Sequence, residues 1–151
     1  MDVFGIGPRI AVGGVISFVA TWQIGMRLGR FAYWFVPTGV KITLGTVLLA
    51  LGFYFWLDAV RLIVTRLKSG NLITSGAYRF VRNPMYSGFI VFIVPGISLL
   101  LNNPVIILSS IVMMLVFKMS IYKEERYLKQ KFGIAYENYV SRVKQIVPFV
   151  W

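Results

Sequence analysis

Residues 85–121 decide the fold of this chain, and they read MYSGFIVFIVPGISLLLNNPVIILSSIVMMLVFKMSI. Two apolar runs of 17 residues each, 85–101 and 105–121, are separated only by the Asn-Asn-Pro sequence at 102–104. As a helix, each run rises about 25 Å, close to the ~30 Å thickness of the hydrocarbon core of a bilayer. A connection this short makes the two helices antiparallel neighbours. We therefore predict a transmembrane hairpin.

The hairpin brings two polar clusters to the same membrane edge. One cluster, at 82–86, lies at the start of the first helix, and the other, at 122–125, follows the second. Because the arms are equal in length, both clusters lie at the same depth, and helices packed about 8 to 10 Å apart place them within side-chain reach. The sequence therefore predicts a two-part polar site at this edge.

The rest of the chain is also strongly apolar. Apolar residues make up 58% of its 151 residues, and the mean hydropathy is +0.75, whereas soluble proteins contain roughly 45 to 50% apolar residues. Two further apolar runs, 8–26 and 39–57, are long enough to span a bilayer. We predict an all-α, polytopic membrane protein with about four transmembrane helices. It forms one membrane domain, 1–151, in which 1–64 holds two N-terminal spans and 65–151 holds the polar clusters.

The charged residues are mainly basic, with 16 lysines and arginines against five acids. The basic residues gather in the loop between the second and third spans and after the fourth span, and few lie between the first two spans. This distribution follows the positive-inside rule, so we expect a multi-pass protein of the cell membrane with both termini and the polar site in the cytoplasm. Because the charges lie at span ends and form no stripe along a soluble surface, we expect no nucleic-acid partner.

Cysteine and histidine are both absent from the sequence. Their absence excludes disulfides, thiol nucleophiles, histidine bases and metal sites with His or Cys ligands, and we predict no metal. A small transporter would need an ionisable residue at mid-membrane, and none of the five acids lies there. Transport is therefore a weaker alternative.

The cytoplasmic segments carry helix signals of their own. Asp58 and Arg61, three residues apart beyond the second span, can form an ion pair on one helix face. Residues 122–132 continue the last helix as far as Gly133, a residue typical of a helix end. A second amphipathic helix follows at 136–143. We expect these two C-terminal helices to lie along the membrane surface or to cover the cytoplasmic end of the hairpin.

The cluster at 82–86 contains groups that bind anions. Arg82, together with Arg79 upstream, can hold a carboxylate or a phosphate through charge-assisted hydrogen bonds. Alternatively, both arginines extend to anionic lipid headgroups. The Asn83-Pro84 pair favours a helix start at the proline. The first turn then offers free backbone NH groups to an anionic or polar ligand, those of Met85, Tyr86 and Ser87.

Glu124 and Glu125 supply negative charge at the other cluster. They lie about 100° apart around a helix, so at most one of them points directly at the other arm. A carboxylate at this position can bind an ammonium group; alternatively, the two acids form a solvated charge group at the helix exit with Lys123 and Arg126. Anion-binding groups on one arm and ammonium-binding groups on the other fit a zwitterion, such as an amino-acid-like cofactor.

Five motifs lie in order along residues 45–148. They are Leu72-Ile73-Thr74-Ser75-Gly76-Ala77-Tyr78-Arg79, Arg82-Asn83-Pro84-Met85-Tyr86, Asn103-Pro104, Glu124-Glu125, and Phe132-Gly133 followed by Tyr136, Tyr139 and Pro148. In this combination the chain resembles the membrane-embedded methyltransferases, a superfamily that includes isoprenylcysteine carboxyl methyltransferase and the phospholipid N-methyltransferases. Several ordered motifs at coherent spacing are more specific than any one of them.

The resemblance implies S-adenosylmethionine as the cofactor. It would bind between the start of the third span and the exit of the fourth, under the C-terminal helices, with its ammonium group on Glu124. The half 65–151 would then be the cofactor-binding, catalytic half. The implied cofactor-binding residues are Tyr78, Arg82, Asn83, Pro84, Met85, Tyr86, Glu124 and Glu125.

The resemblance also implies direct displacement at the sulfonium methyl. Orientation and exclusion of water would provide most of the catalysis, with Glu125, Tyr86 and Arg82 as the implied catalytic residues. A carboxylate acceptor needs no proton removed, whereas an amine acceptor needs Glu125 or Tyr86 as a base. The implied acceptor is a lipid or lipidated, isoprenylcysteine-like carboxylate that enters from the membrane lipids. Alternatives are N-methylation of a phospholipid amine, a small four-helix transporter and a non-catalytic membrane protein.

Two positions depart from the better-known members of the superfamily. Asn83 stands where they have histidine, so an amide replaces the imidazole. Ser120 aligns, within a residue, with an arginine that precedes the Glu-Glu pair in the prenylcysteine enzymes. Lys118 or Lys123 can replace the charge of that arginine but not its bidentate geometry. The choice between a carboxylate and an amine acceptor therefore stays open at this stage, as does the oligomeric state.

Overall fold

The structure is a computed structural model that describes residues 7–29, 33–66 and 70–148. The elements in chain order are α1 (Gly7–Leu28), α2 (Thr38–Arg66), η3 (Gly76–Arg79), α3 (Pro84–Ser87), η4 (Gly88–Ile93), α4 (Val94–Leu100), η5 (Pro104–Ile106), α5 (Ile107–Phe132) and α6 (Ile134–Arg142). α3, η4 and α4 follow one another directly and form the first arm of the predicted hairpin. η5 and α5 form the second arm and contact the first, so a helical hairpin is confirmed, while its crossing of a membrane stays a prediction.

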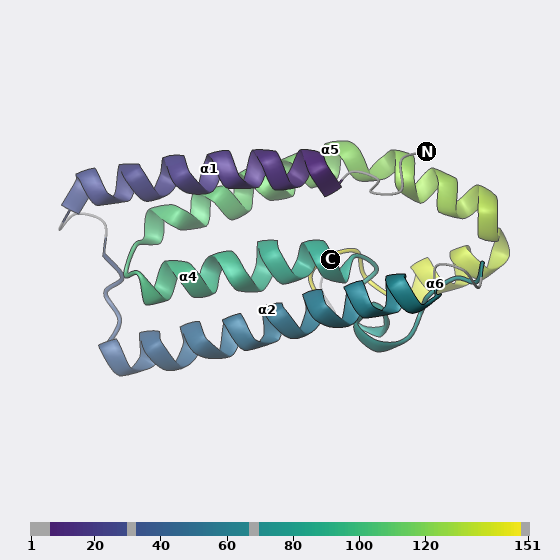
Figure 1. Cartoon of the computed structure of the whole chain (residues 1–151), viewed down its shortest axis with the longest axis horizontal. Helices are drawn as coiled ribbons and strands as arrows, with labels where there is room; N and C mark the ends of the chain where they lie inside the picture. Colours follow the sequence, from purple (N-terminus) through teal and green to yellow (C-terminus); the bar gives the residue numbers. More distant parts are fainter. Residues whose placement is uncertain (1–6, 30–32, 67–69, 149–151) are drawn as a thin grey trace.

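The four long helical segments run side by side along the longest axis of the molecule (Figure 1). α1 packs along α5, α2 packs along α4 and η4, and the two pairs are joined where α4 and η4 contact α5. The turn between α4 and α5 lies at one end of this bundle, and α6 lies at the other end. The all-α fold predicted from the sequence is confirmed.

The outer surface of the bundle is apolar. Within the described residues, three helical segments are long and apolar enough to cross a membrane, Ala11–Leu28, Thr38–Arg66 and Pro104–Phe132, and the apolar arm Pro84–Leu100 is shorter. Val15 is 65% exposed and Met119 is 84% exposed, two of many large apolar side chains on the outside. A surface of this kind needs lipid around it. The chain is therefore a membrane protein, and complete crossing by all four segments stays a prediction.

α5 is longer than the membrane requires. Its 26 residues give a helix of about 39 Å, against a hydrocarbon core of ~30 Å. The apolar part ends at Ile121, and the residues from there to Phe132 include six charged side chains, so we place this last part outside the membrane. Gly133, with φ of +51°, ends the helix as predicted. α6 then turns back toward the bundle (Figure 1).

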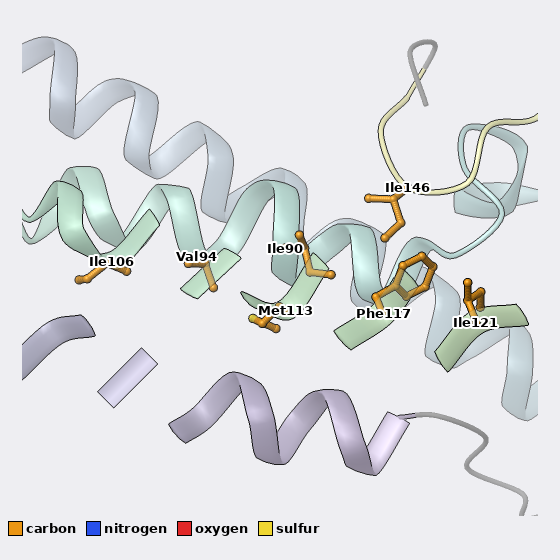
Figure 2. Packing of buried hydrophobic residues seen from close by; sticks show 7 residues of the cluster. All are labelled: Ile90, Val94, Ile106, Met113, Phe117, Ile121 and Ile146. Atoms are coloured by element: carbon orange, nitrogen blue, oxygen red, sulfur yellow. The ribbon is translucent and has the colours of Figure 1, made fainter. Parts of the chain in front are cut away.

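The core of the bundle reaches the end where α6 lies. Figure 2 shows seven buried residues of this cluster, Ile90, Val94, Ile106, Met113, Phe117, Ile121 and Ile146. Most of them come from the two hairpin arms, but Ile146 comes from the segment after α6. Tyr86 packs against the cluster, with its ring centroid 5.3 Å from that of Phe117. The polar site is therefore built directly on a packed apolar layer.

α2 and the first hairpin arm approach each other closely at two pairs of glycines. A Cβ atom on Gly52 would lie 2.9 Å from the carbonyl oxygen of Gly88, and one on Gly96 would lie 3.0 Å from the carbonyl oxygen of Gly45. The contact points are seven residues apart on α2 and eight apart on the arm. In a regular α-helix, residues eight apart differ by about 80° around the axis. The π-helical turn η4 accommodates the extra residue, so both glycines of the arm face α2.

Candidate functional site

An ion pair joins the two polar clusters of the hairpin. Arg82 Nη2 lies 3.2 Å from Glu125 Oε1, and the two side chains are 14% and 27% exposed. The pair connects the segment before α3 with the part of α5 beyond Ile121. The two clusters therefore meet, as the equal lengths of the hairpin arms predicted.

The segment 143–147, which follows α6, lies against the start of the first arm. Val81 and Lys144 form a parallel bridge, and the NH groups of Arg82 and Asn83 donate to the carbonyl oxygens of Lys144 and Gln145 at 2.8 and 3.1 Å. The buried hydroxyl of Ser87 donates to the carbonyl oxygen of Ile146 at 2.7 Å. These hydrogen bonds hold the C-terminal segment over the site. No periodic pattern marks residues 143–147, so this contact could not be predicted from the sequence.

The side chain of Gln145 links the charged groups of the site. Its Nε2 donates to Glu125 Oε1 at 2.9 Å, and its Oε1 accepts a hydrogen bond from Lys118 Nζ at 2.6 Å. Arg82 binds the same oxygen of Glu125. A continuous series of polar contacts therefore runs from Lys118 on α5 to Gln145, returns to α5 at Glu125, and ends at Arg82 of the first arm.

Two buried polar atoms at the site have no hydrogen-bond partner among the described residues. They are Glu124 Oε2, an acceptor, and Arg82 Nε, a donor. Burial, and secondly the neighbouring carboxylate of Glu125, raises the pKa of Glu124 above its ordinary value. A buried polar atom without a partner costs about 1–3 kcal/mol. Each of these atoms therefore marks a position where a ligand group of opposite character is favoured.

Tyrosine side chains line the site with neutral donors. Tyr139 donates its hydroxyl to the carbonyl oxygen of Tyr78 at 2.6 Å, which fastens α6 to η3. Burial raises the pKa of both Tyr78 and Tyr139. Burial, and secondly Glu125, raises the pKa of Tyr136 to about 12. All three side chains are therefore neutral phenols at physiological pH.

The structure brings most of the predicted site residues together. Tyr78 and Tyr86 lie near enough to Glu124 to interact with its charge. Asn83 is directed toward the C-terminal segment, because its Nδ2 donates to the carbonyl oxygen of Gln145 at 3.2 Å. Pro84 and Met85 form the first positions of α3. Contact of these residues with a cofactor stays a prediction.

One expectation for the first arm needs correction. The backbone NH of Ser87, expected to be free for a ligand, donates to the carbonyl oxygen of Asn83 at 2.9 Å, because the helix forms its first regular hydrogen bond there. Arg79 is exposed at the end of η3, whereas Arg82 is half-buried and bound to Glu125. Of these two arginines, only Arg82 contacts the second polar cluster in the described part of the chain.

The predicted ion pair between Asp58 and Arg61 is wrong. Asp58 Oδ2 accepts a hydrogen bond from the backbone NH of Ala77 at 2.7 Å, and the described part of the chain shows no ion pair between Asp58 and Arg61. Ala77 is fully buried, so its NH needs an acceptor inside the protein, whereas Arg61 is exposed to solvent. Asp58 thereby anchors η3 beside α2.

Comparison with known proteins identifies relatives of one kind. Residues 36–130 match the model of the isoprenylcysteine carboxyl methyltransferase (ICMT) family. Protein-S-isoprenylcysteine O-methyltransferase B of Arabidopsis thaliana is 40% identical over 88 residues, which are 58% of this chain and 44% of the relative. Protein-S-isoprenylcysteine O-methyltransferase of Schizosaccharomyces pombe is 38% identical over 86 residues, which are 56% of this chain and 36% of the relative.

A rice protein (Oryza sativa subsp. indica), a probable protein-S-isoprenylcysteine O-methyltransferase, is 42% identical over 83 residues, which are 52% of this chain and 41% of the relative. The chain spans less than half the length of these curated relatives. No solved structure matches it. The matched region contains η3, the first hairpin arm, the second arm as far as residue 130, and the Arg82–Glu125 pair. On this evidence the chain belongs to the isoprenylcysteine carboxyl methyltransferase family.

Proposed function

We propose that this protein is an S-adenosylmethionine-dependent methyltransferase that methylates the carboxylate of a lipidated, isoprenylcysteine-like acceptor. The observation that carries the cofactor assignment is the pair of buried atoms without partners, Glu124 Oε2 and Arg82 Nε. An amino-acid group carries one ammonium and one carboxylate. The acceptor Glu124 Oε2 can bind the ammonium, and the donor Arg82 Nε can bind the carboxylate. Membership of the family supports the methyl-transfer reaction.

The residues of the site divide the binding of the cofactor between them. Glu124 accepts the ammonium group, and Arg82, held in place by Glu125, donates from Nε to the carboxylate. Tyr86 packs against Phe117, which fixes its ring beside Glu124. Tyr78, Asn83, Pro84 and Met85 complete the proposed binding residues on the same arm.

When bound, the cofactor supplies an electrophilic methyl group on a sulfonium. The protein then has to hold the acceptor in line with the methyl group and exclude water. These tasks need a well-packed site and no catalytic acid or base. Segment 143–147 and α6 pack over the site, and Ile146 of that segment also belongs to the apolar cluster. A carboxylate acceptor fits this arrangement better than an amine, because Glu125 Oε1 is already bound to Arg82 and Gln145, and attack by a carboxylate requires no base.

The proposed site lies at the membrane edge. The Arg82–Glu125 pair stands between the exposed apolar surface of the bundle and the charged end of α5. A prenylated acceptor enters from the bilayer, and the cofactor enters from the aqueous side. The excess of basic residues at this end supports a cytoplasmic orientation in a cell membrane, with both termini on that side.

Methyl transfer tests the proposal directly. The protein is purified in detergent and incubated with S-adenosylmethionine labelled at the methyl group, and either a farnesylcysteine analogue or phosphatidylethanolamine. We expect label in the farnesylcysteine analogue as a methyl ester, which alkali releases as methanol. Alkali-stable label in phosphatidylethanolamine would instead identify an N-methyltransferase. Binding of S-adenosylmethionine without transfer to any acceptor would contradict the enzymatic proposal.

Tyr86→Ala is expected to raise the dissociation constant for S-adenosylmethionine about tenfold. The substitution removes a ring that packs on Phe117 at 5.3 Å between centroids, and tenfold corresponds to about 1.4 kcal/mol. Titration calorimetry measures the change. Tyr86→Phe keeps the ring and is the matched control, with an expected change of less than threefold. Equal affinity of wild type and Tyr86→Ala would mean that the cofactor does not bind here.

A further inference from the structure

We propose that Gln145 is a positioning residue for cofactor binding, which acts by holding Glu125 in a fixed orientation. The inference rests on the proposed function, because it assigns a role within that same site. Gln145 lies outside the region 36–130 that matches the family model. Its role therefore follows from the contacts of its side chain alone.

The amide of Gln145 is bound at both ends. Its oxygen accepts from Lys118 at 2.6 Å, and its nitrogen donates to Glu125 at 2.9 Å. The residue is only 9% exposed. Because an ammonium group only donates and an ionised carboxylate only accepts, a neutral amide between them has one favourable orientation. Lys118 thereby determines which end of the amide faces Glu125.

The backbone around Gln145 makes this arrangement rigid. The carbonyl oxygen of Gln145 accepts hydrogen bonds from both the NH and the Nδ2 of Asn83. The next residue, Ile146, is 2% exposed and accepts from the Ser87 hydroxyl. Because these contacts already fix the backbone, only the side-chain rotamers of Gln145 remain to be ordered when its amide forms hydrogen bonds. Gln145 can therefore set the position of Glu125.

The two oxygens of Glu125 therefore differ in their contacts. Arg82 and Gln145 both bind Oε1, so neither of them occupies Oε2. The carboxylate is therefore held through one oxygen, and its second oxygen is left for the ligand that the neighbouring Glu124 binds. Without Gln145, only Arg82 would orient Glu125, and the carboxylate could rotate.

The test compares Gln145→Glu in two backgrounds. This substitution keeps the size of the side chain and an acceptor for Lys118, but it replaces the NH₂ donor that faces Glu125 with an oxygen. In the otherwise wild-type protein we expect the dissociation constant for S-adenosylmethionine to rise about tenfold. In the Glu125→Gln background we expect less than a twofold further rise, because Gln145 acts through Glu125. A tenfold rise in both backgrounds, or no rise in the first, would overturn the inference.

Thermal unfolding in the absence of cofactor gives a second, independent measurement. Gln145→Glu places two carboxylates against each other and should lower Tm, whereas the double variant E125Q/Q145E exchanges donor and acceptor and should recover most of that loss. The control is Gln130→Glu, the same change at an exposed position of α5, which should leave Tm and affinity unchanged. A double variant no more stable than Gln145→Glu would contradict the contact.

If the wild type binds no cofactor, the proposed function fails. If only the inference about Gln145 is wrong, the wild type still binds the cofactor.

Discussion

Replacing Glu124 with glutamine is expected to raise the dissociation constant for S-adenosylmethionine about a hundredfold. Glu124 Oε2 is buried without a partner among the described residues, and we assign the ammonium group of the cofactor to it. A hydrogen bond between charged groups contributes about 1.5–3 kcal/mol, and a loss near the upper end corresponds to about two orders of magnitude in affinity. Titration calorimetry on the detergent-purified protein measures the change.

Glu137→Gln is the matched control for this substitution. Glu137 makes an exposed ion pair with Lys129 at 2.8 Å, and exposed pairs contribute little. We expect affinity within twofold of the wild type. Binding by Glu124→Gln as tight as by the wild type would remove Glu124 from the cofactor site and with it the main support for the proposed function.

Glu124→Gln should have the opposite effect on the stability of the cofactor-free protein. Because burial raises the pKa of Glu124 in the folded state, its proton is held more tightly there than in the unfolded chain, where the value is about 4.3. Glu124 therefore contributes favourably to the free energy of unfolding at a pH below the unfolded-state pKa. This contribution is lost as the pH rises through the folded-state pKa. The Tm of Glu124→Gln should therefore exceed that of the wild type at neutral pH, and the difference should shrink in acid. A lower Tm at neutral pH would show that Glu124 stabilises the free protein.

Gly52→Ala is expected to destabilise the protein by about 3 kcal/mol, the upper part of the range for overpacking. The added Cβ would lie 2.5 Å from Cγ1 of Ile93 and 2.9 Å from the carbonyl oxygen of Gly88. The second contact is with backbone, so α2 and the first hairpin arm must move apart. That displacement also weakens the packing that positions Tyr86 and Arg82. Unfolding of the detergent-purified variant, followed by circular dichroism, measures the loss.

Gly39→Ala on the same helix is the control. A Cβ at Gly39 meets no atom within 4 Å, and alanine has a higher helix propensity than glycine by up to about 1 kcal/mol. We expect equal or slightly higher stability for this variant. Similar losses at both positions would mean that the close approach at Gly52 is not what holds α2 against the arm.

Several features of the site could be predicted from sequence because they depend on local properties. Two apolar runs of 17 residues joined by Asn-Asn-Pro leave few alternatives to an antiparallel hairpin. Equal arms then place their ends at one depth, which accounts for the contact of Arg82 with Glu125. Gly133 marked the end of α5 because helices commonly end at a residue with positive φ, which glycine adopts easily. Its φ in the structure is +51°.

Other features depend on contacts between distant residues. Gln145 binds Asn83 and Glu125, which are 62 and 20 residues away in sequence, and nothing in the segment 143–147 marks these partners. Asp58 binds the backbone of Ala77 instead of Arg61, because a buried NH group requires an acceptor and an exposed arginine does not. The π-helical turn in the first arm likewise reflects the spacing of glycines on α2.

The sequence by itself determined that this is an all-α membrane protein, that its third and fourth apolar runs form a hairpin, and that two polar clusters meet at the hairpin's end. Only the tertiary structure decided that Glu125 binds Arg82 while an oxygen of Glu124 stays without a partner, and that Gln145 holds Glu125 in place. The physical reason is that apolar runs and turns act through neighbouring residues. The rotation of a helix and the choice of a hydrogen-bond partner depend on everything packed around them.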